Sequence, residues 1–201
     1  MEYIKLFDNF FNDRVLIIVD VQKSFKDYFT DNYLKELNHY CNEFNVVYQI
    51  FDNHVDGVPY DKDFLYKKSH EVENTEDLYK FPNQVDIIEK RYNYGVDAEY
   101  YKNILSIDTY NQIKSKKLKR GDFFKTTEGT IIVYIGNNHN WMHLPKKLYD
   151  VFNGLRGKEI VMVGGAENEC LEDLIVSAKA IGLKILKNER FIYSAKKCNI
   201  R

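Results

Sequence analysis

Residues 159–175 read Glu-Ile-Val-Met-Val-Gly-Gly-Ala-Glu-Asn-Glu-Cys-Leu-Glu-Asp-Leu-Ile. The apolar run from Ile160 to Val163 predicts a buried strand, and the two glycines that follow it predict a tight turn. Beyond the turn, apolar residues recur with helical spacing at Leu171, Leu174, Ile175 and Ala178. The pattern therefore predicts a strand, a turn and a helix, with Cys170 at the N-terminus of the helix.

A cysteine in this position is a candidate nucleophile. The unpaired N–H groups and the positive end of the helix dipole favour an anion, so a thiol with an ordinary pKa of about 8.5 is drawn toward the thiolate. Glu167 and Glu169 flank Cys170, and their carboxylates would oppose that effect if they approached the sulfur. The alternative is a buried, unreactive cysteine, which is the usual state of a free thiol. Cys41 and Cys198 have no comparable turn beside them.

Composition indicates one folded unit. The chain has 201 residues, 44% of them hydrophobic, with a net charge of −1, which suffices for a single domain over residues 1–201. The basic run at residues 114–120 is short and lacks interleaved aromatic residues, so no nucleic-acid partner is expected. No apolar stretch is long enough to span a membrane, and three cysteines without paired spacing fit the reducing cytoplasm.

Strand and helix patterns alternate along the chain. Strands are predicted at 14–20, 46–52, 85–90, 159–163, 184–187 and 191–193, and helices at 33–44, 98–117, 145–152 and 170–181. Residues 122–135 predict a hairpin around a Glu128–Gly129 turn, within an insertion at residues 121–143. The predicted fold class is α/β: a three-layer α/β/α arrangement with a mainly parallel, Rossmann-like central sheet and an inserted hairpin and loop before the last strands.

Four polar residues fall at or just past predicted strand ends: Asp20, Asp52, Lys90 and Cys170. Taken singly, each is more simply explained as a capping or surface group. Ligands of parallel sheets bind beyond the carboxyl ends of the strands, and these residues share that edge. Their common placement indicates a functional site.

Three segments of the chain resemble the signature segments of a known enzyme family. They are Val-Asp-Val-Gln-Lys-Ser-Phe at 19–25, Asp-Ile-Ile-Glu-Lys-Arg-Tyr at 86–92 and Gly-Gly-Ala-Glu-Asn-Glu-Cys at 164–170. In this order they resemble the isochorismatase-like cysteine hydrolases, the group that includes nicotinamidases. The resemblance implies a catalytic triad of Asp20, Lys90 and Cys170. It also implies an oxyanion hole formed by the N–H groups of Ala166 and Cys170, with a cis peptide between residues 165 and 166.

A second group of residues predicts a metal site. Asp52 and His54 follow the second strand, and His70 lies further along; one carboxylate and two imidazoles form an open site for zinc or a related divalent ion. The alternative is a loop cap with two exposed histidines. Residues 70–75, His-Glu-Val-Glu-Asn-Thr, resemble the nicotinamidase segment whose histidine helps to hold a metal that binds the pyridine nitrogen. The resemblance favours the metal reading and nicotinamide as substrate.

Two aromatic residues are expected to contact the substrate. The resemblance places Phe25 against the substrate ring, although an aromatic after a first strand is more often part of the core. Asn53 stands where nicotinamidases commonly have a tryptophan, and Trp141 is the candidate replacement. It lies in a predicted loop with His139 and His143, which is either solvated or a lid over the pocket.

The sequence therefore predicts a cysteine-dependent amide hydrolase. The expected reaction is nicotinamide plus water to nicotinate plus ammonia, through a thioester. Two alternatives stay open: another small-amide or isochorismatase-like hydrolase, and a non-catalytic binding or interaction protein on this fold. The expected partner is a small-molecule amide, the expected location is the cytoplasm, and the family resemblance allows a homo-oligomer.

Overall fold

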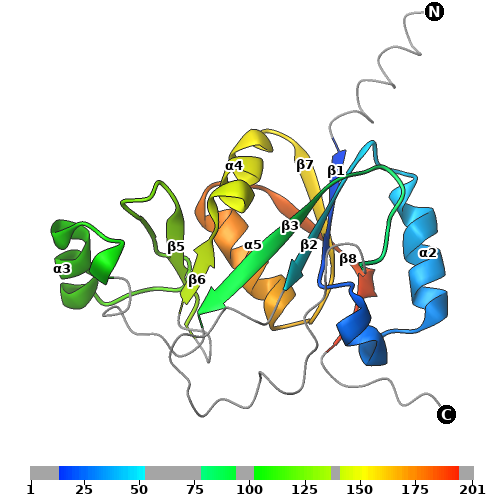
Figure 1. The fold of residues 1–201 in the computed structure, drawn as a ribbon, viewed down its shortest axis with the longest axis horizontal. Coiled ribbons are helices and arrows are strands. Elements are labelled where there is room, and N and C mark those ends of the chain that lie inside the picture. Colours follow the sequence, from blue (N-terminus) through cyan, green and yellow to red (C-terminus); the bar gives the residue numbers. More distant parts are fainter. Residues whose placement is uncertain (1–13, 53–77, 94–101, 137–140, 195–201) are drawn as a thin grey trace, which may run out of the picture.

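The computed structural model of the chain describes residues 14–52, 78–93, 102–136 and 141–194. Their strands form one eight-stranded sheet in the order β4-β5-β6-β3-β2-β1-β7-β8 (Figure 1). The strands are β1 Arg14–Val19, β2 Val46–Asp52, β3 Gln84–Asn93, β4 Phe123–Lys125, β5 Ile131–Tyr134, β6 Trp141–Leu144, β7 Glu159–Gly164 and β8 Ile185–Ile192.

The sheet has a parallel part and an antiparallel part. Strands β3, β2, β1, β7 and β8 are parallel, while β6, β5 and β4 continue the sheet antiparallel beyond β3. β3 belongs to both parts, because residues 84–90 pair with β2 and residues 91–93 pair with β6. The predicted α/β fold with a mainly parallel sheet and an inserted hairpin is confirmed.

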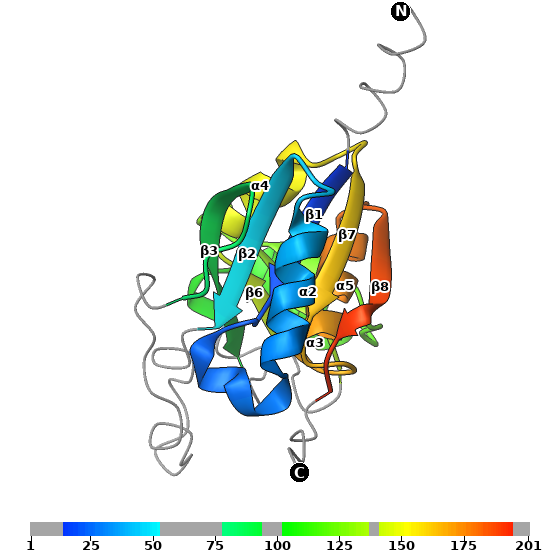
Figure 2. The ribbon, with the colours of Figure 1, turned by 90° about the vertical axis from the view of Figure 1, so that its right-hand side faces the viewer.

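Helices cover both faces of the parallel part (Figure 2). They are the 3-10 helix η1 Lys23–Tyr28 and the α-helices α2 Asp31–Cys41, α4 Lys146–Gly154 and α5 Cys170–Ala180, whereas α3 Ile107–Ser115 lies at the antiparallel end of the sheet. Alternate residues of β1 serve the two faces: Val15, Ile17 and Val19 join the core beside α4 and α5, whereas Leu16 and Ile18 join the core beside α2. In the described parts of the chain, no helix combines the length and the apolar character needed to cross a lipid bilayer.

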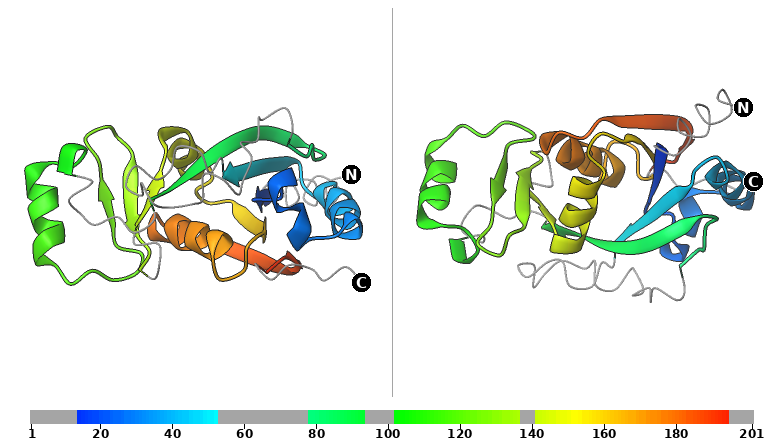
Figure 3. Two further views of the ribbon diagram at one scale, coloured as in Figure 1. Left: turned by 60° about the horizontal axis from the view of Figure 1, so that its bottom comes forward. Right: turned by 90° about the horizontal axis from the view of Figure 1, so that it is seen from above.

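A third, smaller core lies under α3 at the antiparallel end of the sheet (Figure 3). Its buried members are Leu105, Tyr110, Ile113, Phe124, Ile132 and Trp141. The predicted loop around Trp141 is therefore wrong in part, because residues 141–144 form β6 between β3 and β5. Residues 137–140, which include His139, lie outside the described part of the chain.

Two other predicted elements differ in extent. The separate extended pieces at 184–187 and 191–193 are one strand, β8, whose pairing with β7 shifts register between Met162 and Gly164. The long helix predicted at 98–117 is, within the described residues, a short 3-10 turn followed by α3. The hairpin around Glu128–Gly129 is confirmed as β4 and β5.

Candidate active site

A buried ion pair joins two of the predicted catalytic residues. Lys90 Nζ lies 2.8 Å from Asp20 Oδ2, and both side chains are at most 1% exposed. Lys90 projects from β3, and Asp20 directly follows β1, so the fold joins residues from two strands that β2 separates. Such burial is tolerated only when each charge has a partner, which makes the pair a defined feature of the site.

The backbone holds Asp20 in an unusual conformation. Its φ of 54° lies in the left-handed region, which a non-glycine residue seldom adopts. The Asp20 N–H donates to the Ile50 carbonyl at 2.8 Å, and the Asp20 carbonyl accepts from the Gln22 N–H at 3.0 Å. Residues in rare backbone conformations concentrate at functional sites, where surrounding contacts maintain them.

The turn after β7 lies directly beside Asp20. Gly164 pairs in register with Val19, and the Gly165 N–H donates to the Val19 carbonyl at 3.0 Å. Gly164 has a φ of 104°, and a Cβ there would overlap the Val19 carbonyl oxygen, so only glycine fits. The close approach of β1 and the turn explains the first of the two glycines seen in the sequence.

Cys170 is the first residue of α5, as predicted. Its side chain is half-buried and packs against the core beside α4 and α5. The helix N-terminus directs its positive dipole end toward this residue. Glu167 and Glu169 are exposed, so solvent screens the charges that would oppose a thiolate.

Ala166 has the backbone properties expected of an oxyanion-hole residue. The peptide bond between Gly165 and Ala166 is cis, as the family resemblance implies. The Ala166 carbonyl accepts from the N–H groups of Glu169 and Leu171 at 3.1 and 3.3 Å, which fixes the turn against the start of α5. No hydrogen bond to another described residue uses the Ala166 N–H, which leaves this donor for a ligand.

Tyr193 is a site residue that the sequence did not reveal. Its hydroxyl donates to the Asp20 carbonyl at 2.7 Å, and its ring occupies the space where a Cβ on Gly165 would project. Burial raises the pKa of Tyr193 well above its ordinary value, and the negative charges of Asp20 and Cys170 raise it further. Asp20 and Cys170 thus lie near the same phenol. The one signal in the sequence was Gly165, the second glycine after β7, which has no side chain to occupy this space.

The two aromatic residues predicted to contact substrate lie in different environments. Phe25, in η1, is half-buried, and its ring lies 6.1 Å from that of Tyr28. Trp141 is 2% exposed in β6 and packs edge-on against Phe124 and Tyr134, at centroid distances of 6.0 and 5.2 Å. The expectation that Trp141 forms a wall of the pocket is not supported, because its ring belongs to the small core under α3.

Asp52 is the one predicted metal ligand within the described backbone. It is the last residue of β2 and pairs in register with Lys90, which places it on the same sheet edge as the ion pair. The described structure does not include its side chain, nor His54 and His70. Among the residues that the structure does describe, no group of three or more His, Cys, Asp or Glu residues is arranged to hold a metal. The zinc site stays a prediction.

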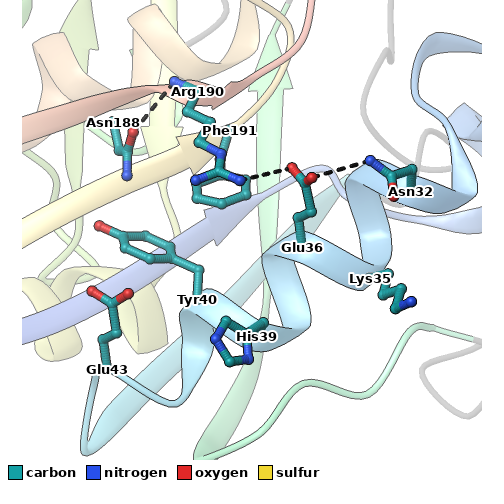
Figure 4. Close-up of a pocket in the computed structure, with 9 residues that line it drawn as sticks. All are labelled: Asn32, Lys35, Glu36, His39, Tyr40, Glu43, Asn188, Arg190 and Phe191. Atoms are coloured by element: carbon teal, nitrogen blue, oxygen red, sulfur yellow. Dashed lines mark hydrogen bonds and ion pairs between the residues drawn. The ribbon is translucent and has the colours of Figure 1, made fainter.

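A surface pocket of about 450 Å³ lies between α2 and β8 (Figure 4). Arg190 crosses it, with its guanidinium 3.2 Å from a Glu36 carboxylate oxygen and 5.3 Å from the centre of the Phe191 ring. The Tyr40 ring also stacks on Phe191, with 4.7 Å between the two ring centres. Glu36 and Arg190 thus pair with each other in this pocket, and none of its lining residues is a cysteine or a serine.

The chain was compared with family models, with curated proteins and with solved structures, and none of them matches.

Proposed function

We propose that this protein is a cysteine-dependent hydrolase of small amides, with nicotinamide as its substrate. The observation that supports this most is the buried Asp20–Lys90 pair, set beside a turn that leads into Cys170 at a helix N-terminus. A charge pair removed from water at a ligand-binding sheet edge is costly to build, and active sites are where such arrangements concentrate. Three sequence segments resemble those of the isochorismatase-like cysteine hydrolases, the group that includes nicotinamidases, and this resemblance implies the same three residues as the catalytic triad.

In the proposed reaction, Asp20 accepts the proton of the Cys170 thiol while the sulfur attacks the amide carbonyl carbon. The carbonyl π electrons move onto oxygen, and the resulting oxyanion accepts hydrogen bonds from the N–H groups of Ala166 and Cys170. When the C–N bond breaks, Asp20 returns the proton and ammonia departs, which leaves a thioester. Water, deprotonated by Asp20, attacks the thioester, and its collapse releases the carboxylate and restores the thiol.

Lys90 has an electrostatic part in this scheme. Its ammonium group, 2.8 Å from Asp20, favours the ionised carboxylate and offsets the negative charge that develops around the sulfur. Asp52, His54 and His70 are proposed to hold a divalent metal, zinc by preference, which when bound would supply an attachment point for the pyridine nitrogen. A thiol-dependent mechanism requires a reduced cysteine, so we propose the cytoplasm as the place of action.

The direct test is ammonia release from nicotinamide, measured with purified full-length protein supplied with zinc. Wild type should produce ammonia and nicotinate in equal amounts, and Cys170→Ala should abolish both because no thioester can form. Cys41→Ala is the control, since Cys41 is buried in α2 away from the sheet edge and should retain activity. A protein inert toward nicotinamide but active on other primary amides would keep the hydrolase and remove the substrate assignment.

The reactivity of the cysteines separates the enzyme from a binding module. Iodoacetamide at neutral pH should modify Cys170 much faster than Cys198, and Cys41 should not react in the native protein. Burial raises the pKa of the Cys41 thiol to about 12, so it stays protonated. Rates for the three thiols, read by peptide mass spectrometry, test this order. Equal rates at Cys170 and Cys198 would favour a non-catalytic protein.

A further inference from the structure

Tyr193 contacts both loops that bring the proposed catalytic residues together. Its hydroxyl donates to the backbone carbonyl of Asp20 at 2.7 Å, after β1. Its own N–H donates to the Gly164 carbonyl at 3.0 Å, and its carbonyl accepts from the Glu167 N–H at 2.8 Å. Tyr193, which directly follows β8, therefore bonds to both the Asp20 loop and the turn that precedes Cys170.

The ring of Tyr193 also accounts for the glycine at position 165. A Cβ built on Gly165 would overlap three atoms of the Tyr193 ring. A side chain at position 165 and the Tyr193 ring would therefore compete for the same space. Gly165 is buried, and the space its side chain would need is filled by the ring of Tyr193, the residue that follows β8. The tyrosine ring fills the space beside Gly165, so no void remains there.

Aromatic neighbours fix the Tyr193 ring. It stacks with Tyr28 at 6.3 Å and an interplanar angle of 15°, and it packs tilted against Phe29 at 5.3 Å. Tyr28 and Phe29 lie at the end of η1, the segment that also contains Phe25. A ring held on several sides presents its hydroxyl in one direction, which suits a residue that fixes a loop.

We propose that Tyr193 is a positioning residue, which sets Asp20 relative to Cys170 through its hydroxyl and its ring; this role rests on the proposed amide hydrolysis. Asp20 has a left-handed backbone conformation that its neighbours must maintain. The Tyr193 phenol donates one hydrogen bond to the Asp20 carbonyl, and the Gln22 N–H donates another. Because burial keeps the pKa of Tyr193 well above its ordinary value, the hydroxyl remains a donor at neutral and mildly alkaline pH.

The test compares Tyr193→Phe with Tyr33→Phe in the full-length protein. Tyr33 is a matched control, because its hydroxyl also donates to a backbone carbonyl, that of Phe191 at 3.0 Å, within the same aromatic cluster. Tyr33 does not bond to Asp20 or to the turn at 164–167. Both variants should fold with similar melting temperatures, since each loses one hydroxyl and keeps its ring.

Tyr193→Phe should lower kcat about 10-fold with KM changed less than about 2-fold, the size of one lost buried hydrogen bond acting on the reacting groups. It should also slow the alkylation of Cys170 several-fold at neutral pH, because Asp20 no longer accepts the thiol proton in the right place. Tyr33→Phe should leave both values within about 2-fold of wild type. Equal behaviour of the two variants would overturn the positioning role.

The outcomes separate this role from the proposed function. If wild-type Cys170 reacts rapidly and amide is hydrolysed but Tyr193→Phe resembles Tyr33→Phe, only the positioning role fails. If wild-type Cys170 is no more reactive than Cys198 and no amide is hydrolysed, the proposed function fails, and the positioning role fails with it.

A packing test uses the shared volume. Gly165→Ala should lower the melting temperature of the wild-type protein, because the new Cβ meets the Tyr193 ring. Introduced into the wild-type protein, Tyr193→Ala should lower the melting temperature. Introduced into the Gly165→Ala variant, the same substitution should raise it, because it removes the ring that the new Cβ meets. Gly154→Ala, where nothing lies within 4 Å of the added Cβ, is the control background, and there Tyr193→Ala should remain destabilising. A destabilising effect in every background would show that the two residues do not share the space.

Discussion

At the scale of single residues, the Asp20–Lys90 pair affects the stability of the fold as well as the proposed chemistry. Both side chains are at most 1% exposed, so neither can find water if its partner is removed. Breaking a buried pair leaves an uncompensated charge, whereas replacing both partners with neutral groups avoids that penalty. The pair can therefore be separated experimentally into its structural and its catalytic parts.

Asp20→Asn and Lys90→Met should each lower the free energy of unfolding by about 3 kcal/mol, because each removes the oppositely charged partner of a buried charge. The double variant should be more stable than either single variant, yet without amidase activity. Denaturant unfolding and ammonia release measure the two effects. Glu159→Gln, which breaks the exposed 2.7 Å pair with Arg14, is the control and should cost less than about 1 kcal/mol. Additive losses in the double variant would contradict the argument.

At the scale of elements, β3 connects the parallel sheet to the inserted strands. Residues 84–90 pair with β2, and residues 91–93 pair with β6, so Lys90 lies where one pairing gives way to the other. The antiparallel strands are therefore hydrogen-bonded, through β6, to the strand that contains a proposed catalytic residue. Arg120, just before β4, lies 3.4 Å from Asp173 of α5, which ties the segment that leads into β4 to the helix that begins at Cys170.

Two aromatic residues from different elements should separate packing from substrate contact. Trp141→Ala should lower the free energy of unfolding by about 3 kcal/mol or more, because it empties the core under α3, while KM for nicotinamide stays unchanged. Phe25→Ala, in the half-buried η1, should raise KM at a smaller cost in stability. Thermal or denaturant unfolding beside steady-state kinetics gives both values. A raised KM in Trp141→Ala would restore the expectation of a tryptophan wall.

At the scale of the whole molecule, three buried or half-buried groups with raised pKa values lie in the core on the α2 side of the sheet. They are Cys41, Tyr33 and Tyr193. Burial is the first cause in each case, and it favours the neutral form in the folded state. Above about pH 9 for the thiol and about pH 10 for the phenols, the unfolded chain loses these protons while the folded protein retains them.

The stability of the protein should therefore fall as the pH rises above 9. The contribution of these groups is complete below their unfolded pKa values and is lost as the pH rises through the folded values, at up to about 1.4 kcal/mol per pH unit for each group. Urea unfolding at pH 8, 9, 10 and 11 measures the slope. Cys41→Ala should flatten it between pH 9 and 10, whereas Cys198→Ala should not. An unchanged slope in Cys41→Ala would contradict the role of this thiol.

The sequence predicted the elements that have strong local signals. β1, β2 and β7 are apolar runs with sharp ends, and the helix spacing after Gly165 placed Cys170 correctly at the start of α5. β6 escaped prediction because it has four residues, includes His143 and follows a polar segment; its pairing with β3 and β5 depends on contacts that are distant in sequence. The proposed triad was recognisable by motif, but the role of Tyr193 depends on the space beside Gly165, which only the folded structure defines.

The hydrogen bond between Tyr193 and Asp20 joins residues 173 positions apart, which has a consequence for biosynthesis. A nascent chain acquires Asp20, Lys90 and Cys170 before it acquires Tyr193, which bonds to the Asp20 loop and to the turn that precedes Cys170. Contacts this distant in sequence form late, because the intervening chain must be ordered first. The proposed nucleophile would thus gain its proposed proton acceptor in the right place only after nearly the whole sheet has assembled, so an unfinished chain would have little of the proposed activity.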